Sequence, residues 1–228
     1  MNLHYKYEIG VDSAYIIYLP DNEKSCQYAN ECAKSCEDVG MPCKLWPAFD
    51  GTGDEIKVPE HLNNKDWLKW IKCSNPTLDK TEISIFLAHI SLWAECAEQD
   101  KPIVILEHDA IVLQKITQHF AMNAIIYLGS HEQVGNNFIS NAVPIMMQWQ
   151  GLRCLCRAHA YSIDPFIARR LLSSVMVTGI NKSVDVYMRS DIFTQIQNGI
   201  FAYDKKNSES VIKRNKSPED KRICGKIL

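Results

Sequence analysis

Residues 101–110 read Lys-Pro-Ile-Val-Ile-Leu-Glu-His-Asp-Ala, and this stretch decides the fold class. Residues 103–106 form a short, continuous apolar run, rich in β-branched side chains, that is typical of a buried parallel strand. Glu107, His108 and Asp109 follow at its carboxyl end, the edge where ligands bind in open α/β sheets. Two carboxylates that flank one residue there suit a divalent cation bridging to a phosphate. A solvent-facing strand end, or a helix cap, explains the same pattern without a ligand.

The composition is that of an ordinary globular domain. The chain has 228 residues, 46% hydrophobic and 23% charged, with a formal net charge of -2. This balance gives no overall basic footprint for nucleic acid, and no apolar run reaches the length of a transmembrane segment. Residues 1–10 are polar and carry no signal-peptide core. We therefore expect a cytoplasmic protein with one α/β domain over residues 1–203 and a charged tail over 204–228.

Strand and helix signals alternate along the first half of the chain. Residues 14–19 predict a strand, and Pro20 stops it. Asp21 and Asn22 can cap a helix that runs to position 39, and residues 44–46 predict the next strand. Strand, helix and strand over this distance form one βαβ unit.

A second helix is expected over residues 77–99. Asp79 can be its N-cap, with Glu82 as the capping-box partner three residues on. His89 lies beside the apolar stripe of this helix, a position where a histidine is more often a core residue than a ligand. A short helix is expected around residues 64–71 as well.

The second half is expected to add strands at 124–128, 154–162 and 200–203. The second of these carries His159, which is either a metal or diphosphate contact or a structural histidine. Asp164 followed by Pro165 predicts the start of a helix over residues 166–176.

Six segments, taken in order, resemble glycosyltransferase family 25, the lipooligosaccharide and procollagen galactosyltransferase group. The resemblance covers residues 14–203 and implies an α/β fold of the GT-A type, a Rossmann-like sandwich that binds a nucleotide sugar. It also implies an inverting transfer, of galactose or glucose, assisted by a divalent cation that is usually manganese. The six segments are AYIIYLP, WPAFDG, TEISIFLAHISLW, PIVILEHDA, AHAYSID with the following ARRLL, and SVDVYM.

The resemblance assigns roles to three acids. Glu107 and Asp109 stand at the two acidic positions of the DxD-type motif, with Asp109 the better metal ligand and Glu107 near the donor ribose or a metal-bound water. A cation held by these carboxylates stabilises the charge that develops on the departing nucleoside diphosphate. Asp185, in SVDVYM, matches the late acidic motif and is our candidate base for the acceptor hydroxyl. A helix cap or a salt bridge explains Asp185 equally well.

The remaining donor-site candidates include two departures from the family pattern. His108 stands where members commonly have a second aspartate, which removes one negative charge but leaves an imidazole that can itself bind manganese or zinc. Lys24 is the one cation available where members often have an arginine after the first strand. His89 is a further candidate donor contact, and His159 joins Asp109 and Glu107 as a candidate metal ligand.

The expected acceptor is a glycan or surface polysaccharide. A modified base in DNA is an alternative, because the basic residues of the tail could contact phosphate, although such charge runs are more often solvated tails. A relative that binds a sugar nucleotide or a protein partner without turnover is another, since His108 departs from the motif. The basic residues of the tail are Lys205, Lys206, Lys213, Arg214, Lys216, Lys221 and Arg222.

The nine cysteines raise two alternatives from other functional classes. Their odd number, in a chain too large to need disulfides, favours free thiols. A structural zinc site would use thiols that cluster in sequence, but none has Cys-x-x-Cys spacing. A cysteine hydrolase would pair a thiol with His89 or His159, but no nucleophile signature is present. The clustered cysteines are Cys26, Cys32, Cys36 and Cys43, with the pair Cys154 and Cys156.

Overall fold

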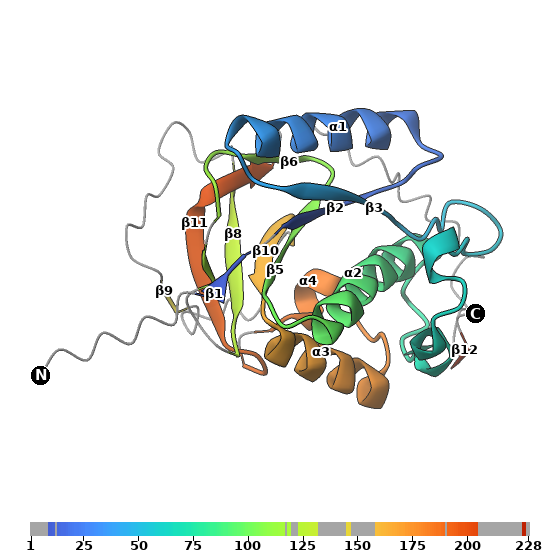
Figure 1. Cartoon of the computed structure of the whole chain (residues 1–228). Helices are drawn as coiled ribbons and strands as arrows, with labels where there is room; N and C mark the ends of the chain where they lie inside the picture. Colours follow the sequence, from blue (N-terminus) through green and yellow to red (C-terminus); the bar gives the residue numbers. More distant parts are fainter. Residues whose placement is uncertain are drawn as a thin grey trace, which may run out of the picture.

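An eight-stranded mixed sheet forms the centre of the molecule (Figure 1). The computed structural model describes residues 9–11, 13–116, 118–119, 123–131, 145–146, 158–189, 191–204 and 225–226. The first three strands of the sheet run parallel, and β10 and β6 are antiparallel to their neighbours. In spatial order the strands are β3 (Cys43–Pro47), β2 (Ala14–Tyr18), β5 (Ile103–Glu107), β10 (Ala160–Ile163), β8 (Ile125–His131), β11 (Gln195–Asp204) and β6 (Ala110–Val112), with β9 (Ile145–Met146) beside β11.

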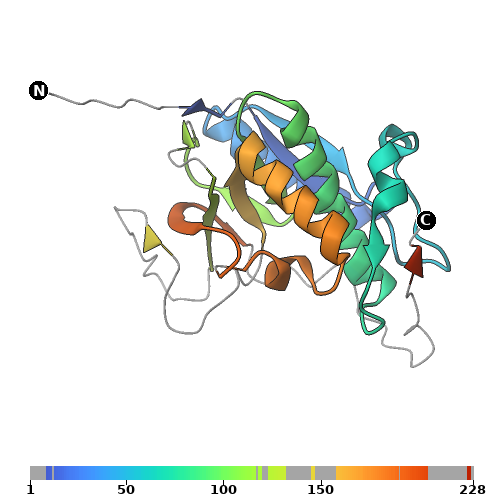
Figure 2. The same cartoon turned by 90° about the horizontal axis from the view of Figure 1, so that it is seen from below.

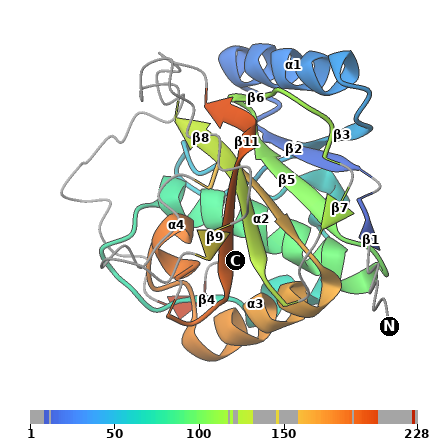
Figure 3. The ribbon, with the colours of Figure 1, turned by 90° about the vertical axis from the view of Figure 1, so that its left-hand side faces the viewer.

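Helices cover both faces of this sheet. Helix α1 (Glu23–Asp38) lies on one face, and α2 (Lys80–Glu98) lies on the other (Figures 1 and 3). Helix α3 (Pro165–Thr178) packs alongside α2, and the short α4 (Val184–Tyr187) also contacts α2 (Figure 2). The α/β sandwich that the sequence predicted is therefore confirmed.

The alternation of side chains in β5 divides the core between these layers. Ile103 and Ile105 belong to the apolar cluster that includes α2, whereas Val104 and Leu106 belong to the cluster that includes α1. All four are essentially inaccessible to solvent, which fits a parallel strand covered on both faces. By the same alternation Glu107 lies on the α2 face of the sheet.

The predicted helix starts are confirmed by their capping bonds. Asn22 Oδ1 accepts from the Ser25 amide at 3.0 Å, so Asn22 caps α1. Asp79 and Glu82 form the expected reciprocal capping box at the start of α2. Asp164 caps α3, and Pro165 is its first helical residue.

Several segments differ from the prediction. Residues 184–187 form the helix α4, although four residues are too few for periodicity to indicate a helix. The expected helix near 64–71 is a five-residue 3-10 helix, η2 (Asp66–Trp70), preceded by η1 (Glu60–Leu62). Strand β10 begins at Ala160, and positions 154–157 of the predicted strand lie outside the described residues.

Two short strand pairings lie outside the central sheet. In the region predicted as tail, β11 extends to Asp204 and β12 (Gly225–Lys226) pairs with β4 (Lys72–Cys73), while the rest lies outside the described residues. Strand β1 (Ile9–Gly10) pairs with β7 (Gln118–His119). Within the described part of the chain, no helix is long and apolar enough to cross a membrane.

Candidate active site

The topology creates a switch point at the carboxyl ends of β2 and β5, and we call this edge of the sheet the crevice. The chain leaves β2 through α1 to reach β3 on one side, whereas β5 lies on the other side of β2. Ligands of open α/β sheets bind at such a switch point, outside the carboxyl ends of the strands. Ile17 pairs with Glu107 in this register, so the loop after β2 and the Glu107–Asp109 segment meet at one edge.

Glu107 contacts His89 at this edge. His89 Nε2 lies 3.4 Å from Glu107 Oε1, and the His89 side chain is completely buried, whereas that of Glu107 is 30% exposed. Burial lowers the pKa of His89 to about 4. Burial, followed by the negative charges of Asp109 and Asp185, raises the pKa of Glu107 to about 8. His89 thus reaches the crevice through Glu107 and has no exposed surface of its own.

The acids expected at the site are within electrostatic reach of one another. Asp109 and Asp185 both raise the pKa of Glu107, and Asp204 at the end of β11 adds a smaller effect of the same sign. Asp185 lies in α4, and its Oδ1 accepts a hydrogen bond from the Ala158 amide at 3.1 Å. The structure therefore places the segment 107–109 and Asp185 of α4 within electrostatic reach of each other.

The other predicted residues lie around this group of acids. His108 stacks on Tyr28 of α1, with 5.9 Å between ring centroids, on the opposite side of the sheet from α2. Lys24 is exposed in the first turn of α1, directly after the loop that follows β2. Both are thus at the edge where a diphosphate would lie in this topology.

His159 is placed inside the sheet rather than at its edge. Its side chain is 1% exposed, and its Nδ1 lies 3.3 Å from the hydroxyl of Tyr127 in β8. Its ring packs so closely on Gly129 that a Cβ at that position would come within 2.2 Å of Nε2. The His159 carbonyl accepts the Glu107 amide at 2.9 Å, which links its backbone to the site.

A cavity of about 270 Å³ lies beside the crevice, and sequence reasoning did not identify it. It is bounded by the loop after β2 and by the segment after β3, where Asp50 bridges to Lys57 through the backbone. The signal for it was WPAFDG, because this stretch contains Ala48, whose amide donates to the Tyr18 carbonyl at 2.8 Å and so joins the two segments. Its lining is contributed by Leu19, Pro20, Asp21, Asn22, Ala48, Asp50, Thr52, Lys57, Val58, Pro59 and Glu60.

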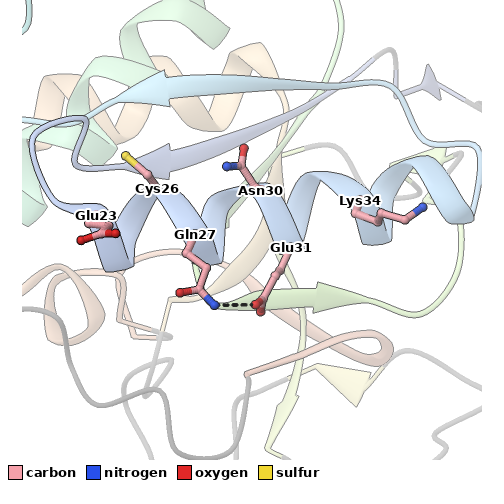
Figure 4. Close-up of a pocket in the computed structure, with 6 residues that line it drawn as sticks. All are labelled: Glu23, Cys26, Gln27, Asn30, Glu31 and Lys34. Carbon is pink, nitrogen blue, oxygen red and sulfur yellow. Dashed lines mark hydrogen bonds between the residues drawn. The ribbon is translucent and has the colours of Figure 1, made fainter.

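A larger hollow of about 620 Å³ lies along α1 and is unrelated to the acids (Figure 4). All of its lining comes from that one helix, and the hydrogen bond between Gln27 and Glu31 is internal to it. It offers neither a switch point nor converging carboxylates, so we assign the site to the crevice at β2 and β5.

The zinc and hydrolase alternatives gain no support. The six described cysteines are free thiols, and no group of three histidine, cysteine or acidic side chains in the described residues is arranged to hold a metal. Cys154 and Cys156 lie outside those residues.

A comparison with protein families decides the assignment. The model of glycosyltransferase family 25, described as an LPS biosynthesis protein, matches residues 13–149, more than half of the chain, including Glu107 and Asp109. The chain belongs to glycosyltransferase family 25. It is therefore a glycosyltransferase that uses a nucleotide-sugar donor.

Other comparisons add little to this assignment. The crystal structure of the galactosyltransferase LgtC in complex with donor and acceptor sugar analogues is similar, with a TM-score of 0.42 and 12% identity. That similarity covers 81% of this chain and 73% of LgtC. No curated protein sequence matches. The family assignment thus rests on the sequence match over residues 13–149.

Proposed function

We propose that this family 25 enzyme transfers galactose or glucose, with inversion, from its nucleotide-sugar donor to a hydroxyl of a glycan or surface polysaccharide. The observation that carries the proposal is the meeting of Glu107, Asp109 and Asp185 at the switch point of the sheet. The description of the matched family as an LPS biosynthesis protein favours a surface polysaccharide as the acceptor. A cytoplasmic location, where nucleotide sugars are made, is part of the proposal.

The residues at the crevice fit a divalent cation, for which we propose manganese. Glu107 and Asp109 supply carboxylate oxygens from one short segment, and their repulsion contributes to the raised pKa of Glu107. Cations of this kind are commonly held by one or two carboxylates together with substrate phosphates, so a third protein ligand is not required. The bound cation would neutralise charge on the donor diphosphate.

Two further side chains are proposed to contact the donor. Lys24, at the N-terminal turn of α1, would meet the diphosphate, because the amino end of a helix and a lysine both favour an anion. His108 would add an imidazole next to the two carboxylates. His159, buried against Gly129, is the least accessible of the proposed metal ligands.

Asp185 is the proposed base. It belongs to α4, and its negative charge contributes to the raised pKa of Glu107. An inverting displacement needs a group that removes the proton of the acceptor hydroxyl on the face opposite the leaving diphosphate. Because Asp185 comes from the α2 face and lies outside the segment 107–109, it can act separately from the cation ligands.

The proposal is tested by calorimetric binding of a panel of nucleotide sugars, with and without manganese. We expect one donor to bind the wild type only with manganese, and Asp109→Ala to lose this binding while its unfolding temperature is preserved. The matched control is Asp66→Ala, which removes an exposed carboxylate paired only with Lys69. Manganese-independent binding that is unchanged in Asp109→Ala would refute the proposed cation site.

Two alternatives remain as outcomes of further measurements. Donor binding without transfer or donor hydrolysis would identify a relative that binds without turnover, for which the departure at His108 is the motivating observation. Transfer to a modified base in DNA has no support in the described residues, because the basic tail that suggested it lies almost wholly outside them. Assays with polysaccharide and DNA acceptors, run side by side, distinguish these outcomes.

A further inference from the structure

A chain of polar contacts runs through the core and ends at Glu107. Trp93 Nε1 donates to the Tyr161 hydroxyl at 2.9 Å, and that hydroxyl lies 2.8 Å from His89 Nδ1. On the other side of the imidazole, Nε2 lies 3.4 Å from Glu107 Oε1. Trp93, Tyr161 and His89 are all completely buried. Polar groups in such a dry environment cost free energy unless their partners are fixed.

Two secondary-structure elements, α2 and β10, bring these polar contacts together against β5. His89 and Trp93 are four residues apart in α2, so they lie on the same face one turn apart. Tyr161 of β10 pairs with Ile105 of β5, and Glu107 shares a face of the strand with Ile105. The register of the sheet therefore brings Tyr161 and Glu107 to opposite sides of the His89 ring.

The donors and acceptors determine where the His89 proton lies. The indole of Trp93 can only donate, so the Tyr161 oxygen accepts from it. The phenolic proton then needs an acceptor, and among the described residues the remaining partner of that hydroxyl is His89 Nδ1. A neutral imidazole that accepts at Nδ1 carries its proton on Nε2. Glu107 Oε1 lies 3.4 Å from this nitrogen.

We propose that His89, held in this tautomer by Tyr161 and Trp93, positions the Glu107 carboxylate in the donor site. The inference rests on the proposed role of Glu107 in holding the cation and the donor diphosphate. His89 Nε2 is buried and makes no hydrogen bond to the described residues, and Glu107 Oε1 lies 3.4 Å from it. At 3.4 Å the contact is long, as hydrogen bonds of catalytic groups often are before substrate binds. A hydrogen bond formed from Nε2 to Oε1 in the loaded site would leave Oε2 for the crevice.

His89 is a positioning residue, because it acts through Glu107. Hydrogen bonds to the carboxylates that hold a metal typically change metal affinity or activity by about 10- to 100-fold when they are removed. A histidine that merely fills the core would affect stability and leave the properties of the folded enzyme unchanged. The two roles are therefore separable by measurement.

The first test is the tautomer itself, measured by ¹⁵N NMR of histidine-labelled protein, with the His89 signals assigned by their loss in His89→Gln. We expect the proton on Nε2 in the wild type, and a change in the tautomer balance in Tyr161→Phe, which removes the hydroxyl that donates to Nδ1. A proton on Nδ1 in the wild type, or an unchanged tautomer in Tyr161→Phe, would overturn the inference without reference to any donor.

The second test compares His89→Gln with His89→Asn. The glutamine amide places an N–H near the position of Nε2, whereas asparagine reaches only the position of Nδ1 and leaves Glu107 without its donor. We expect His89→Gln to stay within about threefold of the wild type in manganese and donor affinity, and His89→Asn to lose about 10- to 100-fold. Both variants should unfold at similar temperatures. If His89→Asn fails to fold, Tyr161→Phe serves in its place.

The outcomes separate the two proposals. Weak binding in His89→Asn with near-normal binding in His89→Gln supports the positioning role. Equal affinities in both variants, with a wild type that binds donor and manganese, overturn the positioning role and leave the proposed function standing. A wild type that binds neither overturns the proposed function, and the role of His89 with it.

Discussion

His89 Nε2 and Glu107 Oε1 lie 3.4 Å apart where α2 packs on β5. Burial shifts the pKa values of these two groups in opposite directions. The pKa of His89 is lowered to about 4, and that of Glu107 is raised to about 8. At neutral pH the histidine is therefore uncharged, and the carboxyl group is held partly protonated by its surroundings. The protonation of groups with such shifted pKa values should change when a cation binds. Their effect on the free energy of unfolding of the apoprotein can be measured.

Glu107→Gln should stabilise the protein at neutral and alkaline pH while abolishing donor binding. The folded-state pKa of Glu107, about 8, lies above the ordinary value of 4.5, so its favourable contribution is complete below pH 4.5 and is lost as pH rises toward 8. Glutamine has no ionisable group, so the variant does not lose this stability as the pH rises. Because the side chain is 30% exposed, we expect a discounted gain of about 1–2 kcal/mol at pH 8 and little at pH 4.5, measured by urea unfolding. A variant less stable than the wild type at pH 8 would contradict this.

His89→Gln should change the stability profile on the acid side. The folded-state pKa of His89 is depressed to about 4, below the ordinary value of 6.5, so its contribution is complete above pH 6.5 and is lost as pH falls through 4. Over this window the loss is on the order of 3 kcal/mol in the wild type. The difference in unfolding free energy between wild type and His89→Gln should thus shrink or reverse between pH 6.5 and 4. The matched control is His61→Gln, whose half-exposed ring has a smaller downward shift in pKa, and a difference that stays constant with pH would refute the prediction.

Much of this arrangement was predictable from the sequence, for a physical reason. The apolar run 103–106 and its polar end define a buried strand locally, and the caps at Asn22, Asp79 and Asp164 are short-range signals. Glu107 and Asp109 are separated by one residue in the sequence, so their proximity needed no knowledge of the fold. These features depend on neighbours along the chain.

The contacts across the chain were not predictable in this way. The sequence favoured a core role for His89 over a donor contact, and the pairing of β10 with β5 brings Tyr161 to its ring. His159 was a metal candidate on the strength of its residue type, yet the register of β8 places it against Gly129. The cavity beside the crevice needs two loops that are joined only in three dimensions. Strand order and register determine all three features, and the periodicity of a sequence predicts neither of them.

Gly129→Ala should disturb the backbone under Glu107. A Cβ at this position would lie 2.2 Å from His159 Nε2, so the buried ring must move, and the His159 carbonyl accepts the Glu107 amide. We expect a loss of about 1–3 kcal/mol in unfolding free energy, the usual cost of overpacking a core, together with weaker donor binding. Gly53→Ala is the control, because a Cβ there meets nothing closer than 3.8 Å. Equal stability of the two variants would show that the sheet accommodates the methyl group.

Asp185→Asn should separate donor binding from transfer. The asparagine oxygen can still accept the Ala158 amide, so the local structure of α4 is expected to persist. The amide cannot take a proton, and loss of a general base typically costs about 10²- to 10⁴-fold in rate. We therefore expect donor affinity within a few-fold of the wild type and a kcat for transfer reduced by at least about 100-fold.

Asp38→Asn, which alters only an exposed pair with Lys34 on α1, is the control for a charge change. Full transfer activity in Asp185→Asn would remove Asp185 as the base and direct attention to the other acids at the crevice, of which Asp204 at the end of β11 is the first to test.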